Sequence, residues 1–178
     1  MLSILLFAAA QATPAAAPAA PPPAPPAVNC SDADHTAFDF WIGDWDVYAK
    51  TGTLIAHSKV EKIVNCAISE TYDQFMNRMG QKADYHGRSI SSYVPTDKGW
   101  QQYYVDTGGT AATLKGAASG GSMVFMGKDE ESATTRMTLT PNADGSGRQF
   151  GERSTDDGKT WQLTFDFTYK KRTAAAAK

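Results

Sequence analysis

Charged and polar side chains recur at alternate positions along several strand-like stretches of this chain. Those with the most chemical potential are Glu70, Arg88, Arg136, Arg148 and Glu152. A carboxylate that is buried beside an arginine can act as a general base, as an isomerase or a hydrolase would require. The same groups, with Tyr104, could instead hold the polar end of a small ligand, because a buried charge must find a partner.

Other chemistries have little support. The three histidines, His35, His57 and His86, are far apart in the sequence, and no paired zinc-ligand spacing occurs. No nucleophile-elbow motif is present, and the glycine pairs at 108–109 and 120–121 are typical of hairpin turns rather than phosphate-binding loops. We therefore predict no metal site and no cofactor, and we assign no catalytic residue.

The most patterned stretch is STDDGKTW, residues 154–161. It resembles the Asp box found in the propeller blades of sialidases. A propeller needs several repeated blades, whereas this chain has one such motif and no internal repeat. We interpret the motif as a hairpin, in which Asp156 accepts hydrogen bonds from turn amides, Gly158 adopts a positive φ and Trp161 packs beneath the turn.

The elements that position these residues show a period of two, with turn signals at short intervals, which is typical of an all-β meander. Strands are expected over 44–50, 54–66, 67–75, 85–94, 100–107, 111–117, 122–128, 133–140, 147–155 and 160–172. A short helical turn is possible over 31–40. An up-and-down antiparallel meander of about ten strands avoids open edges by closing into a barrel. In the last strand, alternation places Trp161, Leu163, Phe165, Phe167 and Tyr169 on one face.

The string FDFWIGDWDVY, residues 38–48, contains Gly43-x-Trp45 at the start of the first strand. This resembles the opening of the calycins, the lipocalins and fatty-acid-binding proteins. The longer string resembles that of a bacterial family of exported domains of unknown function with a calycin-like barrel. The resemblance implies a calycin-like barrel and no established activity. It also implies that Trp45 packs against a basic residue of the last strand, Arg172 or Lys171. A haem site at His86, as in nitrobindin-like barrels, is a further alternative.

Composition divides the chain into four parts. Residues 1–12 are predicted to be a signal peptide, 13–28 an Ala/Pro-rich disordered tether, 29–172 a single barrel domain and 173–178 a disordered tail. Export favours a disulfide between Cys30 and Cys66, whereas both would stay reduced in a cytosolic protein. We therefore expect a periplasmic or secreted protein.

The balance of 17 basic and 19 acidic residues provides no basic face for nucleic acid, and the leading apolar run is too short to span a bilayer. We predict that the barrel binds a small apolar or amphipathic molecule without chemistry, through Glu70, Arg88, Tyr104, Arg136 and Glu152. Two alternatives stay open: an enzyme with Glu70 or Glu152 as base beside Arg88 or Arg148, and an envelope interaction module with a filled barrel. Period-two patterning does not say which face points inward.

Overall fold

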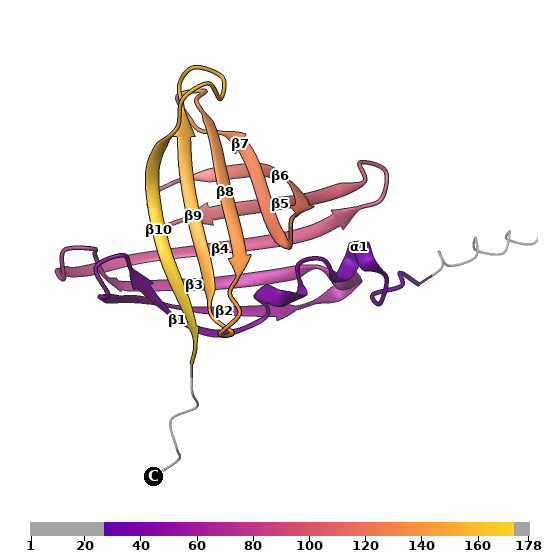
Figure 1. Ribbon diagram of the computed structural model, residues 1–178, viewed down its shortest axis with the longest axis horizontal. Coiled ribbons are helices and arrows are strands. Elements are labelled where there is room, and N and C mark those ends of the chain that lie inside the picture. The colour runs from indigo at the N-terminus through magenta and orange to yellow at the C-terminus, as the bar shows by residue number, and fades with distance from the viewer. Residues whose placement is uncertain (1–26, 173–178) are drawn as a thin grey trace, which may run out of the picture.

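The structure, a computed structural model, describes residues 27–172. Ten consecutive antiparallel strands close into one barrel, because β1 pairs with both β2 and β10 (Figure 1). They are β1 (Gly43–Ala49), β2 (Leu54–Lys62), β3 (Ile68–Met76), β4 (Lys82–Val94), β5 (Gly99–Asp106), β6 (Ala111–Ser119), β7 (Ser122–Lys128), β8 (Thr134–Pro141), β9 (Gly147–Ser154) and β10 (Gln162–Lys171). The predicted all-β, up-and-down barrel is confirmed. The expected signal peptide, most of the tether and the tail lie outside the described residues.

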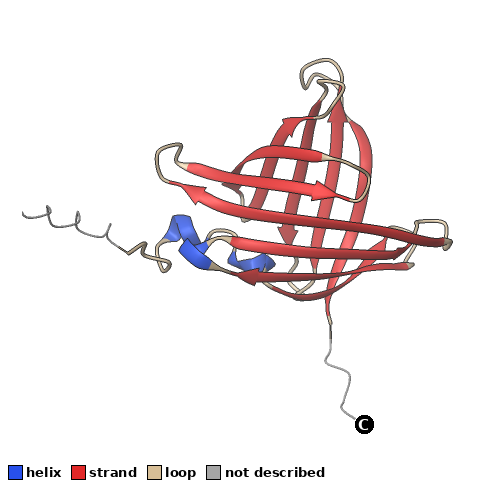
Figure 2. Cartoon of the chain, turned by 180° about the vertical axis from the view of Figure 1, so that it is seen from behind, coloured by secondary structure: helices blue, strands red, loops and turns tan. Residues whose placement is uncertain are grey.

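Two short helical segments precede the barrel and lie at one end of its strands (Figure 2). The helix α1 (Ala33–Thr36) is capped by Asp32, whose side chain accepts a hydrogen bond from the backbone N–H of His35. The 3-10 helix η1 (Asp39–Trp41) follows it, so the predicted helical turn over 31–40 is confirmed. No helix within the described residues is long and apolar enough to cross a membrane.

The strand expected over 54–66 ends four residues early. Its last residues form the 3-10 turn η2 (Val64–Cys66), in which Asn65 and Cys66 have φ values of 53° and 62°. A strand cannot continue through two residues in the left-handed region, and the chain turns there instead. The predicted disulfide between Cys30 and Cys66 is confirmed, and it ties the N-terminal segment to this turn.

One end of the barrel is filled by aromatic side chains. Phe38 and Trp41 from the N-terminal segment pack with Trp45, Trp100 and Phe125 of the strands, and all five are at most 3 % exposed. The indole nitrogen of Trp45 also donates a hydrogen bond to the backbone oxygen of Trp41 at 2.9 Å. This end of the barrel is therefore closed.

The basic partner of Trp45 is Lys171, which lies directly opposite it in the pairing of β1 with β10. Its ammonium lies 3.7 Å from the centre of the indole ring and donates to the backbone oxygen of Ile42 at 2.6 Å. A Cβ on Gly43 would fall on this ammonium, so the glycine leaves it room. Of the two predicted partners, Arg172 is the wrong one, because the next residue along a strand points to the other face, and its guanidinium lies near Asp46.

A β-bulge interrupts β10 between Leu163 and Phe165. A bulge adds one residue to a strand and exchanges the faces on either side of it. Leu163 is consequently 53 % exposed on the outside, whereas Phe165 and Phe167 point into the barrel and stack on each other. The expected single face from Trp161 to Tyr169 is therefore wrong.

Candidate functional site

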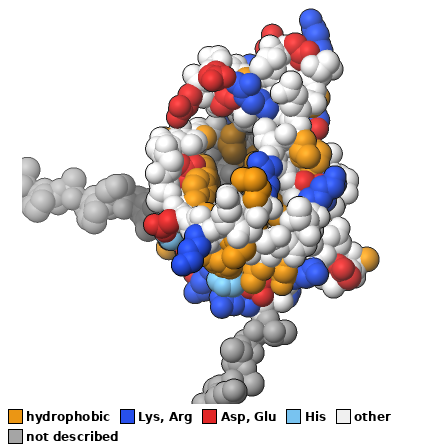
Figure 3. All heavy atoms as spheres, turned by 90° about the vertical axis from the view of Figure 1, so that its left-hand side faces the viewer, with side chains coloured by type: hydrophobic (Ala, Val, Ile, Leu, Met, Phe, Trp, Pro, Cys, Tyr) orange, Lys and Arg blue, Asp and Glu red, His pale blue; other side chains and the backbone are white. Residues whose placement is uncertain are grey.

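The open half of the barrel contains a cavity of about 900 Å³. The space-filling view shows the hollow, with hydrophobic side chains on its walls (Figure 3). Its rim includes the loop from β5 to β6, at Gly108 and Thr110, and the loop from β7 to β8, at 129–131. A volume of this size is within the range of small-molecule sites, which is about 300–1,000 Å³.

The floor of the cavity is where the cavity-lining residues meet the aromatic core. On β3, β5 and β8 the inward residue one step nearer the closed end is part of that core, such as Ile68 below Glu70 and Trp100 below Gln102. The floor residues are Glu70, Gln102, Leu114, Met137, Gln149 and Tyr169. Polar and apolar groups are therefore mixed at the deepest point.

Glu70 is the acidic group of the floor. Its Oε1 accepts a hydrogen bond of 2.7 Å from the hydroxyl of Ser58, which is 2 % exposed. Burial raises the pKa of Glu70, and the hydroxyl groups of Ser58 and Ser89 partly offset that rise. Desolvation thus makes ionisation of this carboxyl costly unless a favourable partner is near.

A chain of hydrogen bonds lies on the wall above Glu70. The hydroxyls of Tyr85 and Tyr104 bond to each other, and Tyr85 donates to Asp106 at 2.8 Å. The ring of Tyr104 lies over Gly87, where a Cβ would come within 2.8 Å of the phenol oxygen. Burial is the main cause that raises the pKa of Tyr85 to about 12 and that of Tyr104 well above its usual range. Both phenols therefore stay neutral.

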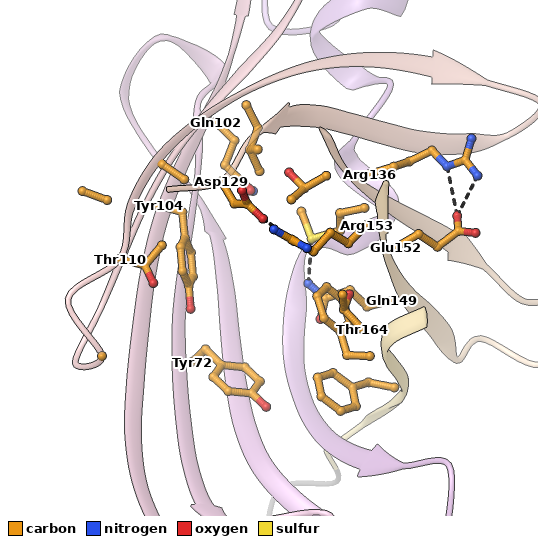
Figure 4. A pocket seen from close by; sticks show the side chains of 18 of the residues that line it. Tyr72, Gln102, Tyr104, Thr110, Asp129, Arg136, Gln149, Glu152, Arg153 and Thr164 are labelled. Carbon is orange, nitrogen blue, oxygen red and sulfur yellow. Dashed lines mark hydrogen bonds and ion pairs between the residues drawn. The ribbon is translucent and has the colours of Figure 1, made fainter. Parts of the chain in front are cut away.

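The facing wall carries two aromatic side chains of β10. Phe165 and Phe167 stack with 5.3 Å between ring centres and both line the cavity. Figure 4 shows Tyr72 and Tyr104 on one side of the hollow, with Gln149, Arg153 and Thr164 on the other. The cavity thus joins a floor of mixed polar and apolar groups to a wall with two stacked aromatic rings.

Arg153 lies nearer the opening, where its guanidinium binds Asp129 and, at 2.7 Å, Glu131. These two acids belong to the loop between β7 and β8, so the ion pairs join that loop to β9. The positive charge of Arg153 is already neutralised at this position.

Of the five predicted ligand-binding residues, the structure brings Glu70 and Tyr104 together in the cavity. Arg136 and Glu152 contribute to the same end of the barrel, but they form an ion pair at 2.9 Å whose side chains point away from Tyr72 and Tyr104 (Figure 4). The guanidinium of Arg136 lies 3.9 Å over the ring of Trp161. This pair therefore supports the wall from outside.

The prediction for Arg88 must be corrected. Its inward neighbours on β4 are Gly87 and Ser89, so alternation directs Arg88 outward, where it binds Asp73. Arg148 also faces outward and forms a bidentate pair with Asp166. Neither arginine lies beside Glu70, so the expected pairing of a cavity base with an arginine is absent from the described residues.

His86 also lies on the outer face of β4, where its ring nitrogens bond to Asp73 at 2.7 Å and Asp84 at 3.0 Å. A haem in the cavity could not reach it from inside. Within residues 27–172, no group of three or more His, Cys, Asp or Glu side chains is arranged to hold a metal ion.

The STDDGKTW hairpin connects β9 to β10. Asp156 accepts from the hydroxyl and the backbone N–H of Thr160, at 2.6 and 2.9 Å, and these bonds with that of Ser154 lower the pKa of Asp156 to about 2. Gly158 has a φ of 87°, and Trp161 donates to its carbonyl. All of these contacts are local, so the motif shapes a turn.

Several cavity residues escaped prediction: Tyr85, Gln149, Arg153, Phe167 and Tyr169. Cross-strand register carries the signal that could have found them. Trp45 pairs with Ser58, Ser58 with Tyr72, and Tyr72 with Gly87, so the inward face of β1 determines that of each following strand.

No protein-family model matches this chain, and no match was found among curated proteins. These two comparisons therefore assign neither a family nor a function to the chain.

The raised pKa of Glu70 leads to a stability prediction. A carboxyl whose pKa is raised by folding binds its proton more tightly in the folded state, so the fold loses stability as the pH rises above the ordinary value of 4.5. Glu70→Gln should therefore raise the melting temperature at pH 7, with a gain that disappears below about pH 4. Thermal unfolding followed by circular dichroism would measure this.

The matched control is Glu61→Gln, because Glu61 is an exposed carboxylate that pairs with Lys59. It should give no gain at pH 7. A Glu70→Gln variant that melts below the unchanged protein at pH 7 would contradict the assignment of Glu70 as a costly buried acid.

Proposed function

We propose that the barrel binds a small apolar or amphipathic molecule in its cavity and performs no reaction on it. The observation that carries the proposal is the hollow of about 900 Å³ with polar groups at its floor. Protein interiors are normally close-packed, and side chains can fill the interior of a barrel of about eight strands. A chain that leaves Phe165, Phe167 and Leu114 around an open space is suited to a ligand.

We further propose that the protein works in the periplasm or outside the cell. The disulfide between Cys30 and Cys66 supports this location, because such bonds form and persist in oxidising compartments. The predicted signal peptide would supply the route.

The alternatives fit the cavity less well. A filled-barrel interaction module does not account for the hollow. An enzyme would have Glu70 as its buried carboxylate, but Arg88 and Arg148, its expected partners, point outward. Binding requires only the groups that face the cavity, so it is the simpler proposal.

Fluorescence titration with N-phenyl-1-naphthylamine, an uncharged probe that brightens in apolar surroundings, tests the proposal. We expect saturable binding of one probe per chain with a dissociation constant at or below about 10 μM, an affinity of roughly −7 kcal/mol. Displacement of the probe by 1-dodecanol should follow a single-site curve. A linear, unsaturable fluorescence increase would overturn the proposed function.

A further inference from the structure

We propose that the cavity selects an amphiphile with a primary amine head, which binds Glu70 at the floor while its apolar tail extends along Phe165 and Phe167 toward the opening. This inference rests on the proposed function and names the chemical class of its ligand. It is carried by three observations: the charges of the cavity, the hydrogen-bond donors and acceptors of the floor, and the position of the apolar wall.

The first observation is that, apart from the outward-pointing pair Arg136–Glu152, the residues lining the cavity include four acidic and two basic side chains. Both basic groups already have an acidic partner: Arg153 binds Asp129 and Glu131, and Lys128 lies 3.5 Å from Asp157. An anionic head group would therefore meet no unpaired cation among these lining residues. The same acidic excess attracts a cationic molecule toward the opening.

Glu70 is the acid of this set that lies at the floor. Within the described residues it forms no salt bridge, and the hydroxyls of Ser58 and Ser89 are its hydrogen-bond partners. Tyr72 and Tyr169 are titratable groups near it, and both carry phenols that remain neutral. A carboxylate in such surroundings gains from a cation at contact distance, because weak screening strengthens their attraction.

The second observation concerns the donors of the floor, several of which already bond to neighbouring protein groups. The amide nitrogen of Gln102 donates to Ser91 at 3.0 Å, and the hydroxyl of Tyr169 donates to Gln149 at 2.8 Å. The hydroxyl of Ser58 donates to Glu70. An ionised carboxylate has about four acceptor sites, so Glu70 retains capacity for further donors. The floor thus favours a head group that donates hydrogen bonds, as an ammonium does three times.

The third observation fixes the orientation of the ligand. Phe167 and Phe165 follow Tyr169 along β10 from the floor toward the opening, with the bulge and Thr164 beyond them. An apolar tail that leaves the floor would lie on these two stacked rings. The head therefore enters first and the tail points outward.

The test compares three compounds with the same twelve-carbon tail below their micelle-forming concentrations: dodecylamine, 1-dodecanol and laurate. Each displaces N-phenyl-1-naphthylamine from the purified protein at pH 7.5, where an alkylamine is protonated and laurate is ionised. We expect dodecylamine to bind at least about tenfold more tightly than laurate, with 1-dodecanol between them.

Glu70→Gln should bring the ratio of the dodecylamine and laurate affinities close to one, because glutamine keeps the shape and loses the charge. The melting temperature of this variant shows separately that it is folded. Glu61→Gln, which removes an exposed carboxylate on the outer face, should leave the ratio as it was.

Laurate binding as tightly as dodecylamine, or an unchanged ratio in Glu70→Gln, would overturn the amine proposal. If 1-dodecanol displaces the probe in either case, the proposed binding function stands and only the preference for an amine head group is lost. Failure of all three compounds and of the probe to bind would instead remove the proposed function itself.

Discussion

Removal of the Cys30–Cys66 disulfide, by Cys30→Ala together with Cys66→Ala, is expected to lower the free energy of unfolding by about 4 kcal/mol. The two cysteines are 36 residues apart. Without the cross-link, the unfolded chain regains the conformational entropy of that loop, and the relation between loop length and entropy leads to this magnitude. Urea unfolding, followed by tryptophan fluorescence, would measure the difference.

The effect should be concentrated at the closed end, because the bond holds the segment that carries Phe38 and Trp41 into the core. Reduction of the unaltered protein with dithiothreitol is the matched control and should reproduce most of the loss. A loss below about 1 kcal/mol in both experiments would show that aromatic packing alone fixes this segment.

Ala112→Trp is expected to weaken binding of N-phenyl-1-naphthylamine by at least about tenfold, equivalent to 1.4 kcal/mol. Ala112 lines the cavity and pairs with Tyr104 across β5 and β6. An indole at this position would occupy the space between the polar wall and the stacked phenylalanines, so the probe would have to displace it. Fluorescence titration of the variant against the unaltered protein measures the change.

The neighbouring substitution Thr113→Trp is the matched control, because Thr113 points outward and is exposed. It adds the same ring to the same strand and should leave probe affinity within about twofold, which is about 0.4 kcal/mol. Equal affinity for both variants and the unaltered protein would place the probe outside the cavity.

Much of the fold could be predicted from the sequence because the signals involved are local. Turn residues at regular intervals indicated where each hairpin lies, and ten short strands in a row have few arrangements other than a closed meander. The strand that was extended to residue 66 shows the limit of this reasoning. Asn65 is a residue type that often adopts a positive φ, but Cys66 is not, so its positive φ could not be predicted from its type.

The site was harder to predict because it depends on which face points inward. Glu70 and Tyr104 were placed with the cavity, but Arg88 and Arg148 share the same period-two signal and point outward. A polar residue at alternate positions is equally consistent with a wet exterior and a polar interior. The closed barrel, with Trp45 on its inner face, determines which of these polar residues point inward.

The bulge in β10 illustrates a further limit. It exchanges the faces of the strand after Leu163, so a pattern that looks continuous in the sequence is split into an outer part and an inner part. The bulge is a change in the pairing register of β10 with β9. It depends on residues of both strands, so the sequence of one strand alone does not predict it.

Both ends of the described chain leave the barrel at its closed end. Cys30 is joined to the turn between β2 and β3, and the backbone N–H of Arg172, just beyond β10, donates to the carbonyl of Asp44 at the start of β1. The opening of the cavity is at the opposite end. A label, a solid support or a fused protein attached through either terminus would therefore leave the entrance free. A molecule that is exchanged with another carrier would pass through the end of the barrel most distant from the attachment.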